Sequence, residues 1–203
     1  MKKQNILEEI SALITEDEII MFQELQIKIK ELNNKTNLTR LIDGDDYWIS
    51  QVFDSIWPFK TFQNINFDNK KFLDIGSGCG FPGLAYAITH PTSEIYLVDS
   101  SKKKTDALKS IIKEINFKSN IHVINARVEN LAHQSSMRNS FDIATTRAVS
   151  NPSTVSEYIL PMLKKEGLGV LYCGKWTDLE SKNLEKTLEI LEGKFKEKKE
   201  ILL

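Results

Sequence analysis

One glycine-rich segment, Lys71–Gly83, constrains the fold of this chain more than any other. A short apolar run there ends in four glycines within eight residues, Gly76, Gly78, Gly80 and Gly83, and an apolar helical pattern follows. Glycine is favoured where the backbone takes a positive φ or comes close to a ligand. A strand, a glycine-rich turn and a helix are typical of open α/β sheets that bind nucleotide-like ligands at the carboxyl ends of their strands.

A second apolar run, residues 95–98, ends at Asp99. An acidic residue at the tip of the second strand of such a sheet is placed to accept hydrogen bonds from ribose hydroxyls. The sequence therefore predicts Asp99 as a ribose ligand.

The glycine segment fits two ligand patterns. Gly78–Gly83 matches the dinucleotide pattern G-x-G-x-x-G, and an ordinary tight turn is a further alternative. Asp74 is expected to lie at the end of the strand beside the ligand, where its charge repels a pyrophosphate. S-adenosylmethionine instead brings a sulfonium and an ammonium group, which a carboxylate attracts. The order D-x-G-x-G-x-G from Asp74 to Gly80 therefore favours S-adenosylmethionine over NAD.

Apolar runs and helical patterns alternate from Lys71 onwards. The predicted strands are residues 72–75, 95–98, 121–125, 141–145 and 168–172, and the predicted helices are residues 82–89, 102–116, 152–164 and 178–192. Alternation of this kind predicts a mostly parallel sheet with helices on both faces, joined by right-handed crossovers. We expect residues 61–203 to form this α/β domain.

Residues 1–60 are predicted to form a helical extension packed on that domain. Apolar residues recur at helical spacing over residues 6–14, and Thr15–Glu18 is a capping-box pattern that begins a second helix. A third helix is expected over residues 45–57, with Pro58 ending it.

Composition excludes several classes of protein. With 41% hydrophobic residues and a net charge of −1, the chain can form a core but is not broadly basic, so RNA binding requires a local patch. Cys79, Cys173 and three scattered histidines have neither metal nor disulfide spacing, which indicates a reducing cytosol and no metal site. No signal peptide and no run long enough to span a membrane are apparent.

Basic residues follow three of the predicted strands. Lys102–Lys104 open a helix, where cations oppose the helix dipole. Arg127 follows the third strand and Arg147 follows the fourth, so both are expected at the edge where ligands bind. Phosphate contacts are the functional interpretation, and a solvated face or an Arg127–Glu129 ion pair is the alternative.

The turn after the fourth predicted strand lacks the motifs that two classes of methyltransferase use for catalysis. Asn151–Ser153 lacks the second proline and the aromatic residue of amino-group methyltransferases, and it has no cysteine beside a proline, as cytosine-C5 enzymes require.

Several short motifs occur together in one order. They are Asn37-Leu38-Thr39, Asp54-Ser55, Gly80-Phe81-Pro82-Gly83, Asp99-Ser100 with Lys103-Lys104, Arg127-Val128-Glu129, and Thr146-Arg147-Ala148. Over residues 33–175 the chain resembles the bacterial small-subunit ribosomal RNA guanine-N7 methyltransferases, also called glucose-inhibited division protein B.

This resemblance implies a monomeric, cytoplasmic class I methyltransferase with a Rossmann-like fold that uses S-adenosylmethionine and acts on N7 of a guanine in 16S ribosomal RNA or the 30S subunit. Guanine N7 carries a free lone pair, so no catalytic base is expected. The implied substrate-binding residues are Lys103, Lys104 and Arg147. The implied cofactor-binding residues are Asp74, Gly76, Gly78, Gly80, Phe81, Asp99, Ser100, Arg127, Val128, Glu129 and Arg147.

The chain departs from the family pattern at three places. Gln51 stands where the family has a histidine, and Gly174-Lys175 replaces Lys-Gly. Ile201–Leu203 is expected to begin a strand, and the final strand pair of the family sheet is expected to be missing. A methyltransferase for a small molecule or a protein, and a catalytically impaired cofactor-binding protein, are the alternative functions.

Overall fold

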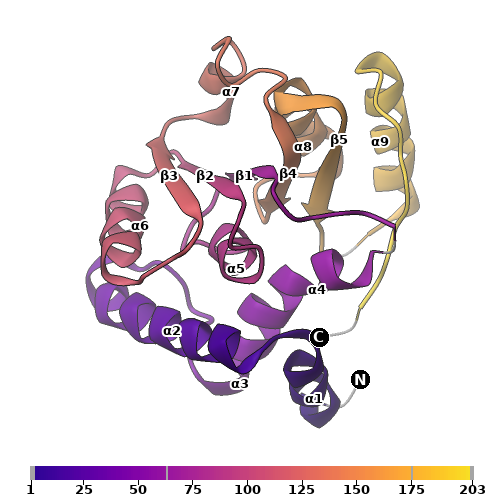
Figure 1. The fold of residues 1–203 in the computed structure, drawn as a ribbon. Coiled ribbons are helices and arrows are strands. Elements are labelled where there is room, and N and C mark those ends of the chain that lie inside the picture. Colours follow the sequence, from indigo (N-terminus) through magenta and orange to yellow (C-terminus); the bar gives the residue numbers. More distant parts are fainter. Residues whose placement is uncertain (1–2, 63, 175, 202–203) are drawn as a thin grey trace.

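A computed structural model describes residues 3–62, 64–174 and 176–201. Five parallel strands form one sheet in the described part of the chain: β1 (Lys71–Ile75), β2 (Glu94–Asp99), β3 (Asn120–Asn125), β4 (Phe141–Arg147) and β5 (Leu163–Tyr172). The strand order is β3-β2-β1-β4-β5 (Figure 1). The order reverses between β1 and β4, and ligands bind open α/β sheets outside the carboxyl ends at such a point.

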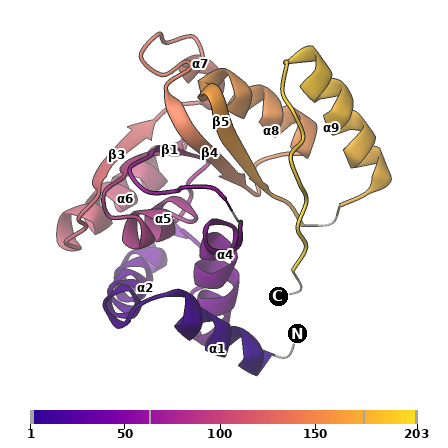
Figure 2. The same cartoon turned by 45° about the vertical axis from the view of Figure 1, so that its right-hand side comes forward.

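Helices cover both faces of the sheet, as predicted. Alternate strand residues point to opposite faces, so Phe72 and Ile95 pack with α5 (Gly83–Thr89) and α6 (Lys102–Glu114). Leu73 and Val98 face the other way, towards α7 (Val128–Leu131) and α8 (Pro152–Ile159). The last helix, α9 (Asp178–Ile190), packs on the outside of α8 (Figure 2).

The N-terminal segment forms α1 (Lys3–Leu13), α2 (Glu16–Thr36), α3 (Gly44–Tyr47), a π-helix over Trp48–Phe53 and α4 (Asp54–Thr61). The Thr15 capping box that begins α2 is present as predicted.

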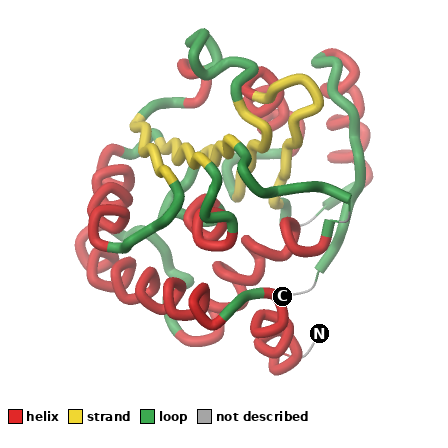
Figure 3. Tube along the Cα trace, in the orientation of Figure 1, coloured by secondary structure: helices red, strands yellow, loops and turns green. Residues whose placement is uncertain are grey.

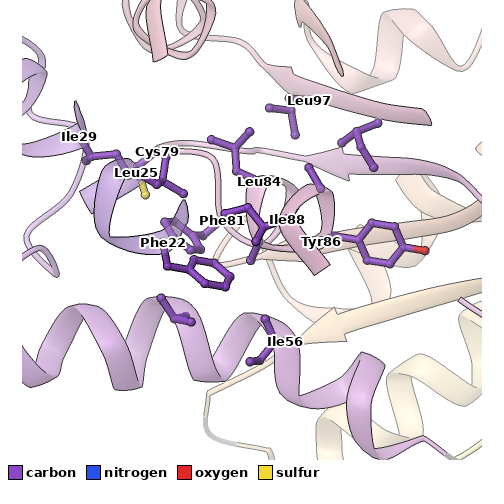
Figure 4. Close-up of a cluster of buried hydrophobic side chains, with 14 of the residues drawn as sticks. Phe22, Leu25, Ile29, Ile56, Cys79, Phe81, Leu84, Tyr86, Ile88 and Leu97 are labelled. Atoms are coloured by element: carbon purple, nitrogen blue, oxygen red, sulfur yellow. The ribbon is translucent and has the colours of Figure 1, made fainter. Parts of the chain in front are cut away.

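The buried stripe of α2 joins these helices to the sheet domain. Its residues Phe22, Leu25 and Ile29 are fully buried and lie in one hydrophobic cluster with Leu84 of α5 and Ile56 of α4 (Figure 4). Burial of each such side chain stabilises the fold by about 1.5–3 kcal/mol. The two parts therefore share a core, and a domain boundary near residue 60 stays a prediction.

Two expected element boundaries are wrong. Pro58 does not end its helix: α4 continues to Thr61, because Pro58 and Phe59 are buried in the core and the chain widens into a π-helix just before it. The helix predicted to reach residue 164 ends at Ile159 instead. Pro161 has no N–H to continue the α-helical hydrogen bonds, so a 3-10 turn over Leu160–Met162 leads directly into a longer β5.

The segment after α9 is a loop in the described residues (Figure 3). Ile201 is not in a strand, and Leu202 and Leu203 lie outside the described residues. No described helix is long and apolar enough to cross a membrane.

Candidate cofactor and substrate cleft

The glycine loop between β1 and α5 is folded against the end of β2. Gly76, Gly78 and Gly80 have positive φ values of 73°, 56° and 103°. The amides of Gly76 and Ser77 both donate to the Val98 carbonyl, at 2.8 and 3.0 Å, and the Gly80 amide donates to the Ser77 carbonyl at 2.7 Å. These loop amides are therefore already paired inside the protein.

Asp99 holds the same loop with its carboxylate. Oδ2 accepts from the Gly78 amide at 2.9 Å and Oδ1 accepts from the Ser101 amide at 2.8 Å. Each carboxylate oxygen can accept more than one hydrogen bond, so Asp99 retains acceptor sites for ribose hydroxyls. The exposed Ser100 lies at the same tip, and Asn125 of β3 fixes it by donating to the carbonyls of Asp99 and Ser100, each at 3.0 Å. Sequence reasoning missed Asn125.

Asp74 lies underneath the loop rather than beside a ligand. Its side chain is fully buried, Oδ2 accepts from the Gly83 amide at 3.0 Å, and Oδ1 accepts from the Thr145 hydroxyl at 3.1 Å. Burial, which disfavours the ionised form, raises the pKa of Asp74 to about 6. This placement corrects the expectation of a carboxylate facing the cofactor, and any effect of Asp74 on a ligand acts through the loop.

Two further predicted cofactor residues have buried side chains. Phe81 is 3% exposed and packs edge-on against Tyr47, with 5.8 Å between ring centroids. Val128 is buried in the cluster that covers the other face of the sheet. With these side chains buried, only the backbone of Phe81 and Val128 could meet a cofactor, and their role as cofactor-binding residues stays a prediction.

Arg147, at the end of β4, is held by the N-terminal helices. Nη1 donates to the Ser50 carbonyl at 3.0 Å, to Asp54 Oδ2 at 3.1 Å and to the Ser55 hydroxyl at 3.4 Å, while Nη2 donates to Gln51 Oε1. The side chains of Arg147 and Asp54 are only 18% and 24% exposed. Burial raises the pKa of the Asp54 carboxyl, although the nearby guanidinium opposes this rise.

Gln51 extends this network to the glycine loop. Its Nε2 donates to the Thr39 hydroxyl at 2.9 Å and to Cys79 Sγ at 3.6 Å. Burial raises the pKa of the Cys79 thiol, so the sulfur is a neutral acceptor. Sequence reasoning gave no site role to Thr39, Gln51 or Asp54, although all three lie in or beside the motifs that carry the resemblance.

Exposed cations lie along the same edge of the sheet. Arg127 follows β3, and Lys103 lies in the first turn of α6 after β2; both are exposed, while Lys104 is half-buried. In the part of the chain that the structure describes, neither Arg127 nor Lys103 has an ion-pair partner, so the expected alternative of an Arg127–Glu129 pair is not observed. No group of acidic, histidine or cysteine residues among the described positions could hold a metal ion.

The raised pKa of Asp74 predicts a pH-dependent stability. Because its folded-state pKa is about 6 and the ordinary value is 3.8, the stability that protonated Asp74 contributes is present below pH 3.8 and is lost as the pH rises through 6. Asp74→Asn should therefore become more stable relative to wild type by about 2–3 kcal/mol between pH 4 and 7. Urea unfolding at several pH values measures this difference, with the exposed Asp68→Asn as control; a difference constant with pH would contradict the assignment.

The Arg147–Asp54 pair predicts non-additive stability effects. Arg147→Met leaves a largely buried carboxylate unpaired and should lower the free energy of unfolding by about 2–4 kcal/mol. Asp54→Ala should cost less in the Arg147→Met background than in wild type, with a coupling energy of about 1–3 kcal/mol. Denaturant unfolding of the two single variants and the double variant tests this, and additive effects would show that the pair is energetically unimportant.

Comparisons with known proteins agree with this architecture. A family model described as rRNA small subunit methyltransferase G (GidB) matches residues 18–201. Proteins named ribosomal RNA small subunit methyltransferase G from Prochlorococcus marinus strains MIT 9312 and AS9601 are 88% and 86% identical over the whole chain, which covers 86% of each relative.

The fold also has solved counterparts. A crystal structure of coclaurine N-methyltransferase, bound to N-methylheliamine and S-adenosylhomocysteine, has a TM-score of 0.51 and 17% identity, covering 83% of this chain and 58% of that one. This likeness concerns the fold alone, which is that of the Rossmann-like class I S-adenosylmethionine-dependent methyltransferases. The match of the family model over most of the chain settles the family: this protein belongs to the rRNA small subunit methyltransferase G family.

Proposed function

We propose that this protein transfers the methyl group of S-adenosylmethionine to N7 of a guanine in the 16S RNA of the small ribosomal subunit. Family membership and the names of the closely related proteins support the RNA of this subunit as the substrate. The structural observation that carries the cofactor assignment is the glycine loop, whose amides at Gly76, Ser77, Gly78 and Gly80 are paired inside the protein. A pyrophosphate needs such amides free, whereas S-adenosylmethionine has no phosphate.

The residues at the carboxyl edge fit this cofactor. Asp99 retains acceptor sites for the two ribose hydroxyls, and Ser100 is exposed beside it. The segment Arg127–Glu129 follows β3, which pairs with β2, and it would border the adenine of the cofactor. When bound, S-adenosylmethionine supplies an electrophilic methyl group on a sulfonium.

Methyl transfer to guanine N7 requires the protein to align the two reactants but not to supply a catalytic base. Guanine N7 carries an in-plane lone pair and loses no proton on methylation. Holding N7, the methyl carbon and the sulfur in line can supply several kcal/mol through proximity. N7 lies in the deep groove of A-form RNA, so the target guanine must be in a loop or a distorted helix. Lys103, Lys104 and Arg147 are the proposed substrate-binding residues, and the exposed Lys103 is the best placed to meet a phosphate.

Methyl transfer to RNA tests this function directly. Wild-type protein with labelled S-adenosylmethionine should label unmethylated 30S particles or free 16S RNA, and mass spectrometry of the nucleosides should find 7-methylguanosine. Lys103→Ala should lower RNA affinity several-fold. It should also make the slope of log affinity against log salt concentration shallower, by the amount expected for the loss of roughly one phosphate contact.

The control for Lys103→Ala is Lys186→Ala, which removes an exposed cation from α9. Label found only in protein or in a small molecule would favour the alternative acceptors, and a labelled base other than guanine would refute the N7 assignment.

A further inference from the structure

Asp54 has one carboxylate oxygen committed and one available. Oδ2 accepts from Arg147, but no described residue donates to Oδ1. In the described part of the chain, every buried side-chain oxygen or nitrogen except Thr146 Oγ1 has a hydrogen-bond partner. Asp54 Oδ1 has no such partner, so it is not buried and is accessible to solvent. A carboxylate that is held rigidly on one side and open on the other is suited to binding a ligand.

Asp54 lies beside the carboxyl end of β4, at the edge of the sheet where the cofactor and substrate are proposed to bind. Arg147, its partner, ends β4 next to β1, and Gln51 connects the same cluster to Cys79 of the glycine loop. Arg147 also makes hydrogen bonds to the Ser50 carbonyl and the Ser55 hydroxyl, which fix the guanidinium and, through it, the carboxylate. The carboxylate therefore has a defined orientation at the switch point between β1 and β4.

We propose that Asp54 recognises the base that is methylated, by accepting hydrogen bonds from the N1–H and the 2-amino group of guanine. This inference rests on the proposed function. Oδ1 of Asp54 is free, and Oδ2 keeps a second acceptor position beside the one that Arg147 occupies, so each oxygen can accept from one of the two parallel N–H donors on the Watson–Crick edge of guanine. Adenine instead presents an unprotonated N1 that a carboxylate repels. N7 lies on the opposite side of the purine, so recognition by this edge leaves it free for methyl transfer. An arginine fork placed on O6 and N7 would instead cover the reacting atom.

Other carboxylates near the cleft are less suited to this role. Asp74 is fully buried, and Asp99, which accepts from the Gly78 and Ser101 amides, is already the proposed ligand of the ribose hydroxyls. Glu129 lies after β3, on the far side of β2 from Arg147. Asp54 alone among these four combines a free oxygen with a fixed partner beside β4.

Base substitution at the methylated position tests the proposal. The guanine methylated by wild type is first mapped, and that position is then replaced by inosine in a ligated 16S RNA. Inosine keeps N7, O6 and N1–H but lacks the 2-amino group. Wild type should methylate the guanine RNA roughly tenfold or more faster than the inosine RNA in kcat/KM, the discrimination expected for loss of part of a bidentate contact.

Asp54→Asn should slow methylation of the guanine RNA and bring the two RNAs to similar rates, because an amide offers only one acceptor and its NH2 opposes N1–H. Asp54→Glu, which keeps the charge, should restore part of the preference. Asp45→Asn, an exposed acid on α3, is the matched control. Thermal melting and S-adenosylhomocysteine binding, measured alongside, should show that Asp54→Asn folds and binds cofactor.

An unchanged guanine-to-inosine ratio in Asp54→Asn, with both rates lowered equally, would overturn the proposal and leave Asp54 as a structural partner of Arg147. Absence of any guanine methylation by wild type would instead refute the proposed function itself, and this inference with it.

Discussion

The buried carboxylate of Asp74 is the interaction on which the arrangement of this site depends. It binds the Gly83 amide, which begins α5, and the Thr145 hydroxyl, which belongs to β4. One side chain of β1 therefore fixes both the glycine loop above it and the strand that carries Arg147. Burial of an acid in an apolar interior is unfavourable, and the hydrogen bonds to its oxygens are what stabilise it there.

The second constraint joins the N-terminal helices to the sheet edge. Arg147 is bound by residues 50–55, which form the π-helix and the start of α4. Tyr172 at the end of β5 adds to this contact by donating its hydroxyl proton to the Ser55 carbonyl at 2.8 Å. The extension thus borders the carboxyl edge of the sheet as well as forming a part of the hydrophobic core. Substitutions that move the start of α4 should therefore also move the glycine loop, because Gln51 contacts both Arg147 and Cys79.

Much of the fold could be predicted because periodicity records which face of each element is buried. The alternation of apolar runs gave all five strands, and Thr15 and Thr177 begin helices with capping boxes, as their local patterns predict. The end of α8 and the start of β5 were missed, because the competition between a helix and a strand near Pro161 depends on pairing with β4.

The site was less predictable than the fold. The roles of Gly76–Gly80 and the place of Asp99 follow from strand, turn and helix in sequence, and the structure puts them together at one edge. The burial of Asp74 and Phe81, and the contact of Gln51 with Arg147, join segments far apart in the chain. No local pattern encodes such partners. The resemblance pointed to these residues without indicating what they contact.

The central claim is that a loop with satisfied amides, clamped by Asp99, binds S-adenosylmethionine and not a dinucleotide. Calorimetric titration with S-adenosylhomocysteine and with NAD tests it most directly. The account predicts saturable binding of S-adenosylhomocysteine, weakened roughly ten- to a hundredfold in Asp99→Ala and unchanged in Asp68→Ala, since unpaired ribose hydroxyls cost about 1–3 kcal/mol. It predicts no binding of NAD, and NAD binding of similar affinity to S-adenosylhomocysteine would contradict it.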